Sequence, residues 1–178
     1  MASETIVLGG GCFWCTEAVY KEVRGITDVE SGYSNGQAQR PTYEEVCTGR
    51  TGHAEVVKLT YDPAQISLRQ ILEIFFVVHD PTQRDRQGND VGTQYRSGIY
   101  TTTPEQKEQA EAMIREMSQE KLFGKPIVTE VQPLSNYWPA EDYHQDFFER
   151  NPHQGYCLAV AAPKVAKFRK TFSELARK

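Results

Sequence analysis

The stretch Thr5-Ile6-Val7-Leu8-Gly9-Gly10-Gly11-Cys12-Phe13-Trp14-Cys15 joins an apolar run to a glycine turn and then to the start of a helix. The β-branched residues at its beginning favour a short buried strand. Three consecutive glycines allow a tight turn with positive φ. The stretch therefore predicts a strand, a turn and a helix, with Cys12 in the first turn of that helix.

A thiol at this position has an electrostatic reason to react. The first N–H groups of a helix are unpaired, and with the helix dipole they favour an anion. We therefore expect the thiolate of Cys12 to form more readily than at an ordinary cysteine. Free cysteines are more often buried and inert. We favour a nucleophile because the glycines, the helix start and two aromatic rings coincide.

Helices and strands alternate along the rest of the chain. The polar loops between them are long for a regular parallel sheet. We therefore predict an α+β fold, a two-layer sandwich with helices packed on a mostly antiparallel sheet; a doubly wound α/β sheet is the alternative. The predicted helices are 12–23, a turn at 43–47, one from Ser67, one from Thr103, 140–150 and a final surface helix, and the predicted strands are 5–8, 26–33, 54–61, 96–101 and 128–134.

The length of 178 residues predicts one domain over residues 1–178, with a C-terminal extension from about residue 151. The net charge of −4 argues against nucleic acid as a partner. No apolar run approaches the ~20 residues of a membrane span. No basic segment followed by an apolar one opens the chain, so we expect no secretory signal, no membrane partner and a cytoplasmic location.

Four cysteines are too few to staple a chain of this size and indicate redox chemistry or metal instead. Cys12 and Cys15 form a C-x-x-C pair typical of a dithiol. A zinc site with Cys12, Cys15, His53 and Cys157 has weak support, because a second close cysteine pair is missing and we expect no metal. Cys47 lies in a locally apolar turn and is predicted to be structural. Cys157 follows a turn-rich segment that suits a recycling thiol or an incidental cysteine.

Glu55 enters the predicted strand 54–61, where alternation places it on the same face as Val57 and Leu59. A carboxyl on an apolar face should have a raised pKa and could act as an acid. A solvated glutamate at the strand edge is an equally good reading of the spacing.

Other candidate residues carry weaker signals. The loop 88–96 could present Asp90 and Tyr95 to a ligand, although an ordinary surface turn is the simpler interpretation. Phe13 and Trp14 could line an apolar pocket or belong to the core. His144 alone is more typical of local structure than of catalysis.

Taken together, several motifs resemble the A-type peptide methionine sulfoxide reductases. The resemblance runs from the first strand to Cys157, and the ordered set is specific although each motif is short. The motifs are Gly11-Cys12-Phe13-Trp14, Pro41-Thr42-Tyr43, Gly52-His53-Ala54-Glu55, Gly88-Asn89-Asp90, Gly92-Thr93-Gln94-Tyr95-Arg96-Ser97, Ala140-Glu141-Asp142-Tyr143-His144-Gln145 and Asn151-Pro152.

The resemblance implies a sandwich with a ferredoxin-like core and an enzyme that reduces the S epimer of methionine sulfoxide, free or in proteins. It implies that Cys12 attacks the sulfur and becomes a sulfenic acid, and that Glu55 donates a proton to the sulfoxide oxygen. The implied substrate-binding residues are Phe13 and Trp14 as an apolar cage, Tyr43 and Tyr95 as O–H donors, and Asp90 and His144 as supports of the network.

The resemblance also implies that a second thiol condenses with the sulfenic acid and that thioredoxin, as external reductant, reduces the disulfide. We rank Cys157 first as this thiol, because it stands at a family recycling position. Cys15 is the competitor, although one turn of intact helix could hold it facing away. We expect no bound cofactor and a monomer. The alternatives are a general thiol–disulfide oxidoreductase and a non-catalytic module that binds oxidised methionine.

Overall fold

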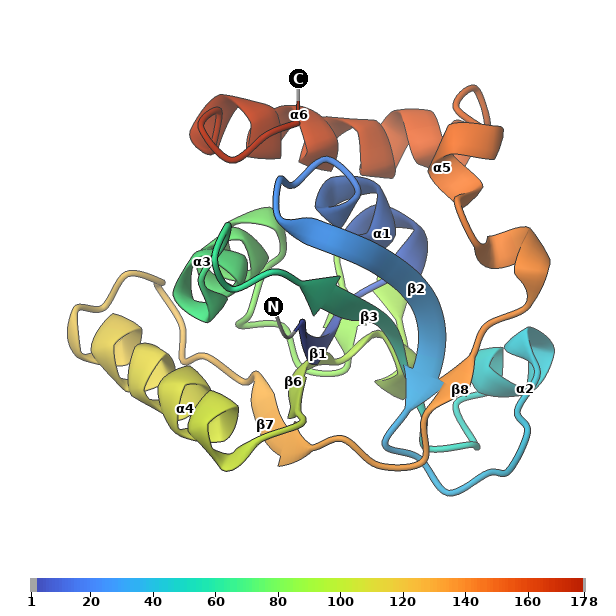
Figure 1. The fold of residues 1–178 in the computed structure, drawn as a ribbon. Coiled ribbons are helices and arrows are strands. Elements are labelled where there is room, and N and C mark those ends of the chain that lie inside the picture. Colours follow the sequence, from blue (N-terminus) through green and yellow to red (C-terminus); the bar gives the residue numbers. More distant parts are fainter. Residues whose placement is uncertain (1–2, 178) are drawn as a thin grey trace.

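The computed structural model describes residues 3–177 and is built around a six-stranded sheet (Figure 1). The strand order in this sheet is β7-β6-β1-β3-β2-β8, and β4 and β5 form a separate two-stranded ribbon. The strands are β1 (Glu4–Gly10), β2 (Ile26–Ser34), β3 (Ala54–Tyr61), β4 (Arg86–Gln87), β5 (Asp90–Val91), β6 (Ser97–Thr101), β7 (Glu130–Pro133) and β8 (Trp138–Pro139). The helical elements are α1 (Phe13–Tyr20), α2 (Tyr43–Cys47), α3 (Leu68–Val78), η1 (Thr93–Tyr95), α4 (Pro104–Gln119), η2 (Asp142–His144), α5 (Phe147–Arg150), η3 (Cys157–Ala161) and α6 (Ala162–Thr171).

The topology confirms the predicted α+β sandwich. β1 pairs antiparallel with both β3 and β6, β3 pairs antiparallel with β2, and β7 alone runs parallel to its neighbour β6. The succession β1-α1-β2-β3-α3-β6, with strand order β6-β1-β3-β2, is a ferredoxin-like core. The alternative of a doubly wound parallel sheet is therefore wrong.

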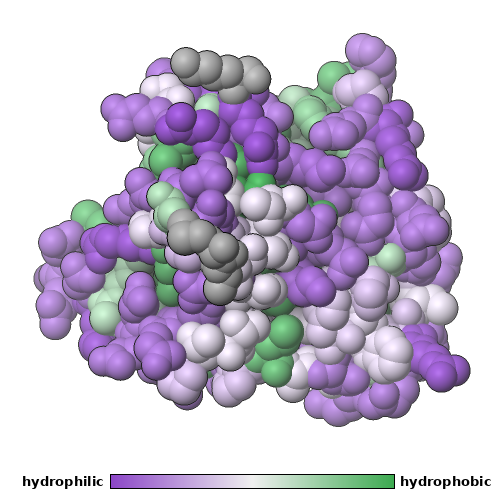
Figure 2. All heavy atoms as spheres, in the orientation of Figure 1, coloured by the Kyte–Doolittle hydropathy of each residue, from purple (hydrophilic) through white to green (hydrophobic). Residues whose placement is uncertain are grey.

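Two apolar clusters hold the layers together. The larger lies between the sheet and the helices, where Val57 and Leu59 meet Phe75 of α3 and Phe168 of α6. The smaller lies on the opposite face of the sheet, around Val56 of β3. The face seen in Figure 2 is mostly hydrophilic, with smaller hydrophobic areas between the polar residues.

The helix that follows the glycine turn begins at Phe13, with Cys12 as its N-cap in an extended conformation (ψ 129°). The helix ends at Tyr20, short of the predicted Val23, because Val23 instead pairs with Ala176. The final helix, predicted to lie on the surface, packs on α1 and α3 and buries Phe168 completely.

The segment 140–150 is the main correction to the predicted elements. It contains the short 3-10 helix η2 and the single turn α5, separated by Asp146 in the left-handed conformation (φ 57°). The side chain of Gln145 bonds both backbone groups of Ser31 on β2 at 2.9 Å, which holds the segment against the sheet edge. Two strands are also shorter than predicted, since β6 begins at Ser97 and β7 spans Glu130–Pro133.

Within residues 3–177, none of the helices combines the length and apolar character that a membrane span needs.

Candidate active site

Gly11 sets the geometry at the start of the site. Its φ is +95°, and a Cβ there would lie 2.7 Å from the side chain of Gln87. Any other residue would meet both backbone strain and a steric clash. The glycine turn thus delivers Cys12 to the mouth of α1, where its side chain is 6% exposed.

The environment of the Cys12 thiol corrects one expectation. The backbone N–H of Trp14 lowers its pKa, as the helix start predicts. Burial raises this pKa by more, and the negative charge of Glu55 adds to the rise, so the pKa lies well above its usual value. In the free protein Cys12 is therefore a protonated thiol, because loss of solvent outweighs the helix terminus.

Glu55 is fully buried on the apolar face of β3, as the alternation predicts, so the reading as a solvated edge residue is wrong. Its Oε1 accepts the backbone N–H of Phe13 at 3.1 Å, and its Oε2 has no hydrogen-bond partner among the described residues. Burial raises the pKa of Glu55 to about 8. The carboxyl is therefore mostly protonated at neutral pH.

Aromatic rings from distant segments surround Phe13 and Trp14. The centroid of the Phe13 ring lies 5.6 Å from that of Tyr33 and 5.1 Å from that of His144. Trp14 stacks on Phe147 at 3.8 Å and donates its Nε1–H to Nδ1 of His144 at 3.0 Å. The two residues after Cys12 thus belong to an aromatic cluster beside the thiol, and His144 is part of it.

Tyr43 and Tyr95 approach the same carboxyl from α2 and η1. Burial raises the pKa of both hydroxyls, and the neighbouring Glu55 is the next cause in each case. Both therefore stay protonated and can donate a hydrogen bond. The ring of Tyr43 also lies 4.3 Å from that of His144.

Asp90 is connected to the cysteines through Tyr156. The Tyr156 hydroxyl donates to Oδ2 of Asp90 and accepts from the Cys15 thiol at 3.6 Å. The edge of the Tyr156 ring faces Trp14, with centroids 5.7 Å apart. Asp90 is thus part of the same cluster, contrary to the simpler interpretation as a surface turn.

The remaining cysteines have different settings. Cys15, one turn into α1, donates its backbone N–H to the carbonyl of Cys12 at 3.1 Å. Cys157 is fully buried at the start of η3, a single π-helical turn, and burial raises its pKa. Cys47 is exposed, so the expectation of an apolar structural position is wrong.

The weak zinc hypothesis finds no support in the arrangement. His53 is occupied by backbone groups, since its Nδ1 accepts from Gly36 and its Nε2 lies 2.8 Å from the carbonyl of Ala38. Among residues 3–177, His, Cys, Asp and Glu side chains nowhere gather in a group of three that could hold a metal ion.

Two residues of the site were not identified from the sequence as site residues. Glu141 accepts from the Tyr33 hydroxyl at 2.7 Å and from the backbone N–H of Tyr43 at 2.9 Å, so it fixes the position of Tyr43. Tyr156 joins Asp90 to Cys15. The only sequence signal for either was its place within or beside a family motif.

Comparisons with known proteins agree with this geometry. The family model "Peptide methionine sulfoxide reductase" matches residues 4–176. A curated relative, peptide methionine sulfoxide reductase MsrA of Saccharolobus solfataricus, is 57% identical over 171 residues, which cover 96% of each chain.

Two solved structures have the same fold. Mxr1 from Saccharomyces cerevisiae in reduced form has a TM-score of 0.83 at 36% identity, covering 89% of this chain and 91% of that chain. Mxr1 in complex with Trx2 has a TM-score of 0.58 at 26% identity, covering 82% of this chain and 84% of that chain.

Proposed function

Since the chain belongs to the peptide methionine sulfoxide reductase family, and is an enzyme that reduces methionine sulfoxide, we propose that it acts on the S epimer through Cys12. The substrate is an uncharged S–O dipole that carries a methyl group. Its methyl group lies in the aromatic cluster of Phe13 and Trp14. Its oxygen points to Glu55, where the hydroxyls of Tyr43 and Tyr95 also donate to it.

The reaction moves an oxygen atom from the substrate to Cys12. The Cys12 sulfur attacks the sulfoxide sulfur while Glu55 donates its proton to the oxygen. Glu55 regains a proton from the Cys12 thiol, so that the pair exchanges one proton and no charge is left in the pocket. Methionine departs and Cys12 is left as a sulfenic acid.

One observation carries the proposal: the buried carboxyl of Glu55, neutral at pH 7, has one oxygen fixed by Phe13 and the other unpartnered beside Cys12. A buried oxygen without a partner costs stability, so its retention indicates a task. A neutral acid beside a nucleophilic sulfur suits an uncharged, polar substrate.

We further propose that Cys15 condenses first with the sulfenic acid. Cys12 caps α1 and Cys15 is its third residue, which are the positions whose side chains approach each other in a capping box. Condensation of the Cys12 sulfenic acid with the Cys15 thiol forms their disulfide and releases water. The Cys157 thiolate then attacks the Cys15 sulfur and frees Cys12. This order supports both thiols in recycling, with Cys15 ahead of Cys157.

A thioredoxin is the proposed reductant of the final disulfide. Mxr1, which shares this fold, has been solved in complex with Trx2, and this supports a thioredoxin as partner.

The deciding experiment compares the two epimers of N-acetyl-methionine sulfoxide, with insulin reduction as a control activity. We expect thioredoxin-dependent reduction of the S epimer alone and no insulin reduction by the protein itself. Reduction of insulin without turnover of either epimer would identify a general thiol–disulfide oxidoreductase. Binding of sulfoxide without any turnover would identify a binding module.

A further inference from the structure

Exposed apolar side chains are rare on this protein, and their positions are uneven. Among residues 3–177, four large hydrophobic side chains are exposed: Val91 at 66%, Leu122 at 61%, Leu158 at 54% and Tyr143 at 51%. Three of them directly follow or precede a residue of the active site. We call Val91, Tyr143 and Leu158 the apolar rim.

Each rim residue is tied to the aromatic cluster through its neighbour. Tyr143 precedes His144, and their rings lie 4.2 Å apart, while His144 accepts the indole N–H of Trp14. Val91 follows Asp90 in β5, and neighbouring residues of a strand point to opposite sides. Asp90 therefore faces Tyr156 while Val91 faces solvent.

Leu158 completes the rim from the C-terminal segment. It lies two residues after Tyr156, whose hydroxyl bonds Asp90 and whose ring edge faces Trp14. The neighbours of all three rim residues thus meet at Trp14, although they come from three separate parts of the chain.

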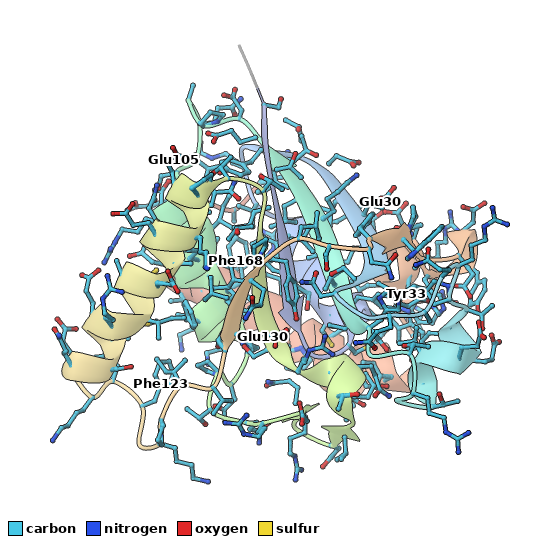
Figure 3. All side chains as sticks on the ribbon, turned by 90° about the horizontal axis from the view of Figure 1, so that it is seen from below. Glu30, Tyr33, Glu105, Phe123, Glu130 and Phe168 are labelled. Carbon is cyan, nitrogen blue, oxygen red and sulfur yellow. The ribbon has the colours of Figure 1, made fainter. Side chains whose placement is uncertain are left out.

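Leu122 provides a contrast within the same chain. It follows α4 and lines a groove with Arg69 of α3. In Figure 3 its neighbour Phe123 lies beyond the end of α4, on the other side of the molecule from Tyr33, whose ring contacts Phe13. An exposed leucine by itself is ordinary, whereas three apolar residues around one site need a reason.

We propose that the apolar rim binds apolar side chains that flank an oxidised methionine in a polypeptide substrate. This inference rests on the proposed function, because a methionine sulfoxide that enters the aromatic cluster leaves its flanking residues at the mouth of the site. The rim residues there can cover apolar flanks and remove them from water. The preferred substrate is then an unfolded or surface-exposed segment in which oxidised methionine has apolar neighbours.

The test measures kcat/KM for three substrates: a peptide with leucine on both sides of methionine sulfoxide, the same peptide with serine there, and N-acetyl-methionine sulfoxide. The rim variants are Val91→Ser, Tyr143→Ser and Leu158→Ser. The matched control is Leu122→Ser, which removes an equally exposed apolar side chain far from the site.

We expect the wild type to prefer the leucine peptide, and each rim variant to lose about fivefold in kcat/KM on it, or about 1 kcal/mol. Turnover of N-acetyl-methionine sulfoxide should stay unchanged in every variant, and Leu122→Ser should behave as wild type. Equal kcat/KM for the two peptides, or an equal loss on all three substrates, would overturn the proposal. Failure of the wild type to reduce any of the three would instead refute the proposed function.

Discussion

Phe13 and Glu55 are joined by a buried hydrogen bond, in which the first N–H of α1 donates to Oε1 of the carboxyl at 3.1 Å. This bond fixes the carboxyl at the mouth of the helix and leaves Oε2 without a partner among the described residues. Because burial keeps Glu55 protonated near neutral pH, the carboxyl can carry a proton at a defined place. The predictions below begin from this pair.

Glu55→Gln should slow the reduction. The amide keeps the acceptor for the N–H of Phe13 but cannot transfer a proton, so we expect kcat to fall by roughly a hundredfold to ten-thousandfold. KM should change little, because the neutral amide fills the same space as the neutral acid. Steady-state assays of the S epimer check this, and an unchanged kcat would exclude Glu55 as the acid.

The pH dependence of kcat/KM should report the same group. The acid must be protonated, and the pKa of Glu55 is about 8, so kcat/KM should fall as the pH rises through about 8. Glu55→Gln should lack this descending limb at its lower rate. A wild-type profile that stays level well above this pH would contradict the assignment.

Stability should depend on pH through Glu55 as well. Its pKa rises from 4.5 to about 8 in the folded protein, so the folded state binds more protons than the unfolded state between these values. The free energy of unfolding therefore decreases as the pH rises through this window, and the loss is complete above it. Urea unfolding at about pH 5 and about pH 8 should show a loss on the order of 3 kcal/mol that Glu55→Gln lacks. Equal losses in both proteins would place the charge cost elsewhere.

Tyr43→Phe and Tyr95→Phe should each lower kcat by on the order of tenfold to a hundredfold, because each removes one donor to the sulfoxide oxygen. The control is Tyr143→Phe, which removes an exposed hydroxyl and keeps the ring. Stopped assays with the S epimer compare the three proteins. A loss in the control as large as in the other two would show that the effect is general to the tyrosines around the site.

The fold and part of the site follow from local patterns in the sequence. The order of strand, glycine turn and helix placed Cys12, and period-two alternation placed Glu55 on the buried face, because both depend on residues close in sequence. The positions of Glu141 and Tyr156 depend on hydrogen bonds to Tyr43 and Asp90 from far along the chain. No local pattern encodes such contacts.

Two further differences arise from burial and tertiary pairing. The helix start predicted a low pKa for Cys12, but the pKa also depends on how completely the packed chain removes water from the sulfur. The residues 140–150 have helical character, yet Gln145 satisfies the backbone of Ser31 on β2 and interrupts the helix. In both cases tertiary contacts outweigh the local preference.

Cys12→Ser should abolish turnover while the sulfoxide still binds. A serine hydroxyl is a far weaker nucleophile toward sulfur and cannot form a sulfenic acid, so the rate should fall below roughly a thousandth of wild type. The cage residues Phe13 and Trp14 remain, so binding of the S epimer measured by calorimetry should persist. Residual reduction at a rate near wild type would refute Cys12 as the nucleophile.

The order of disulfides can be tested by one turnover without reductant, followed by mass spectrometry of the linked peptides. The wild type should end with Cys15 linked to Cys157, because the first disulfide passes from Cys12. Cys157→Ser should stop at a link between Cys12 and Cys15. Cys15→Ser should retain the sulfenic acid on Cys12, detectable with dimedone, because the thiol at the third position of the helix is missing. Cys47→Ser is the control and should match wild type, since Cys47 is exposed outside this relay. A link between Cys12 and Cys157 in both the wild type and Cys15→Ser would show that Cys157 attacks Cys12 directly and that Cys15 takes no part.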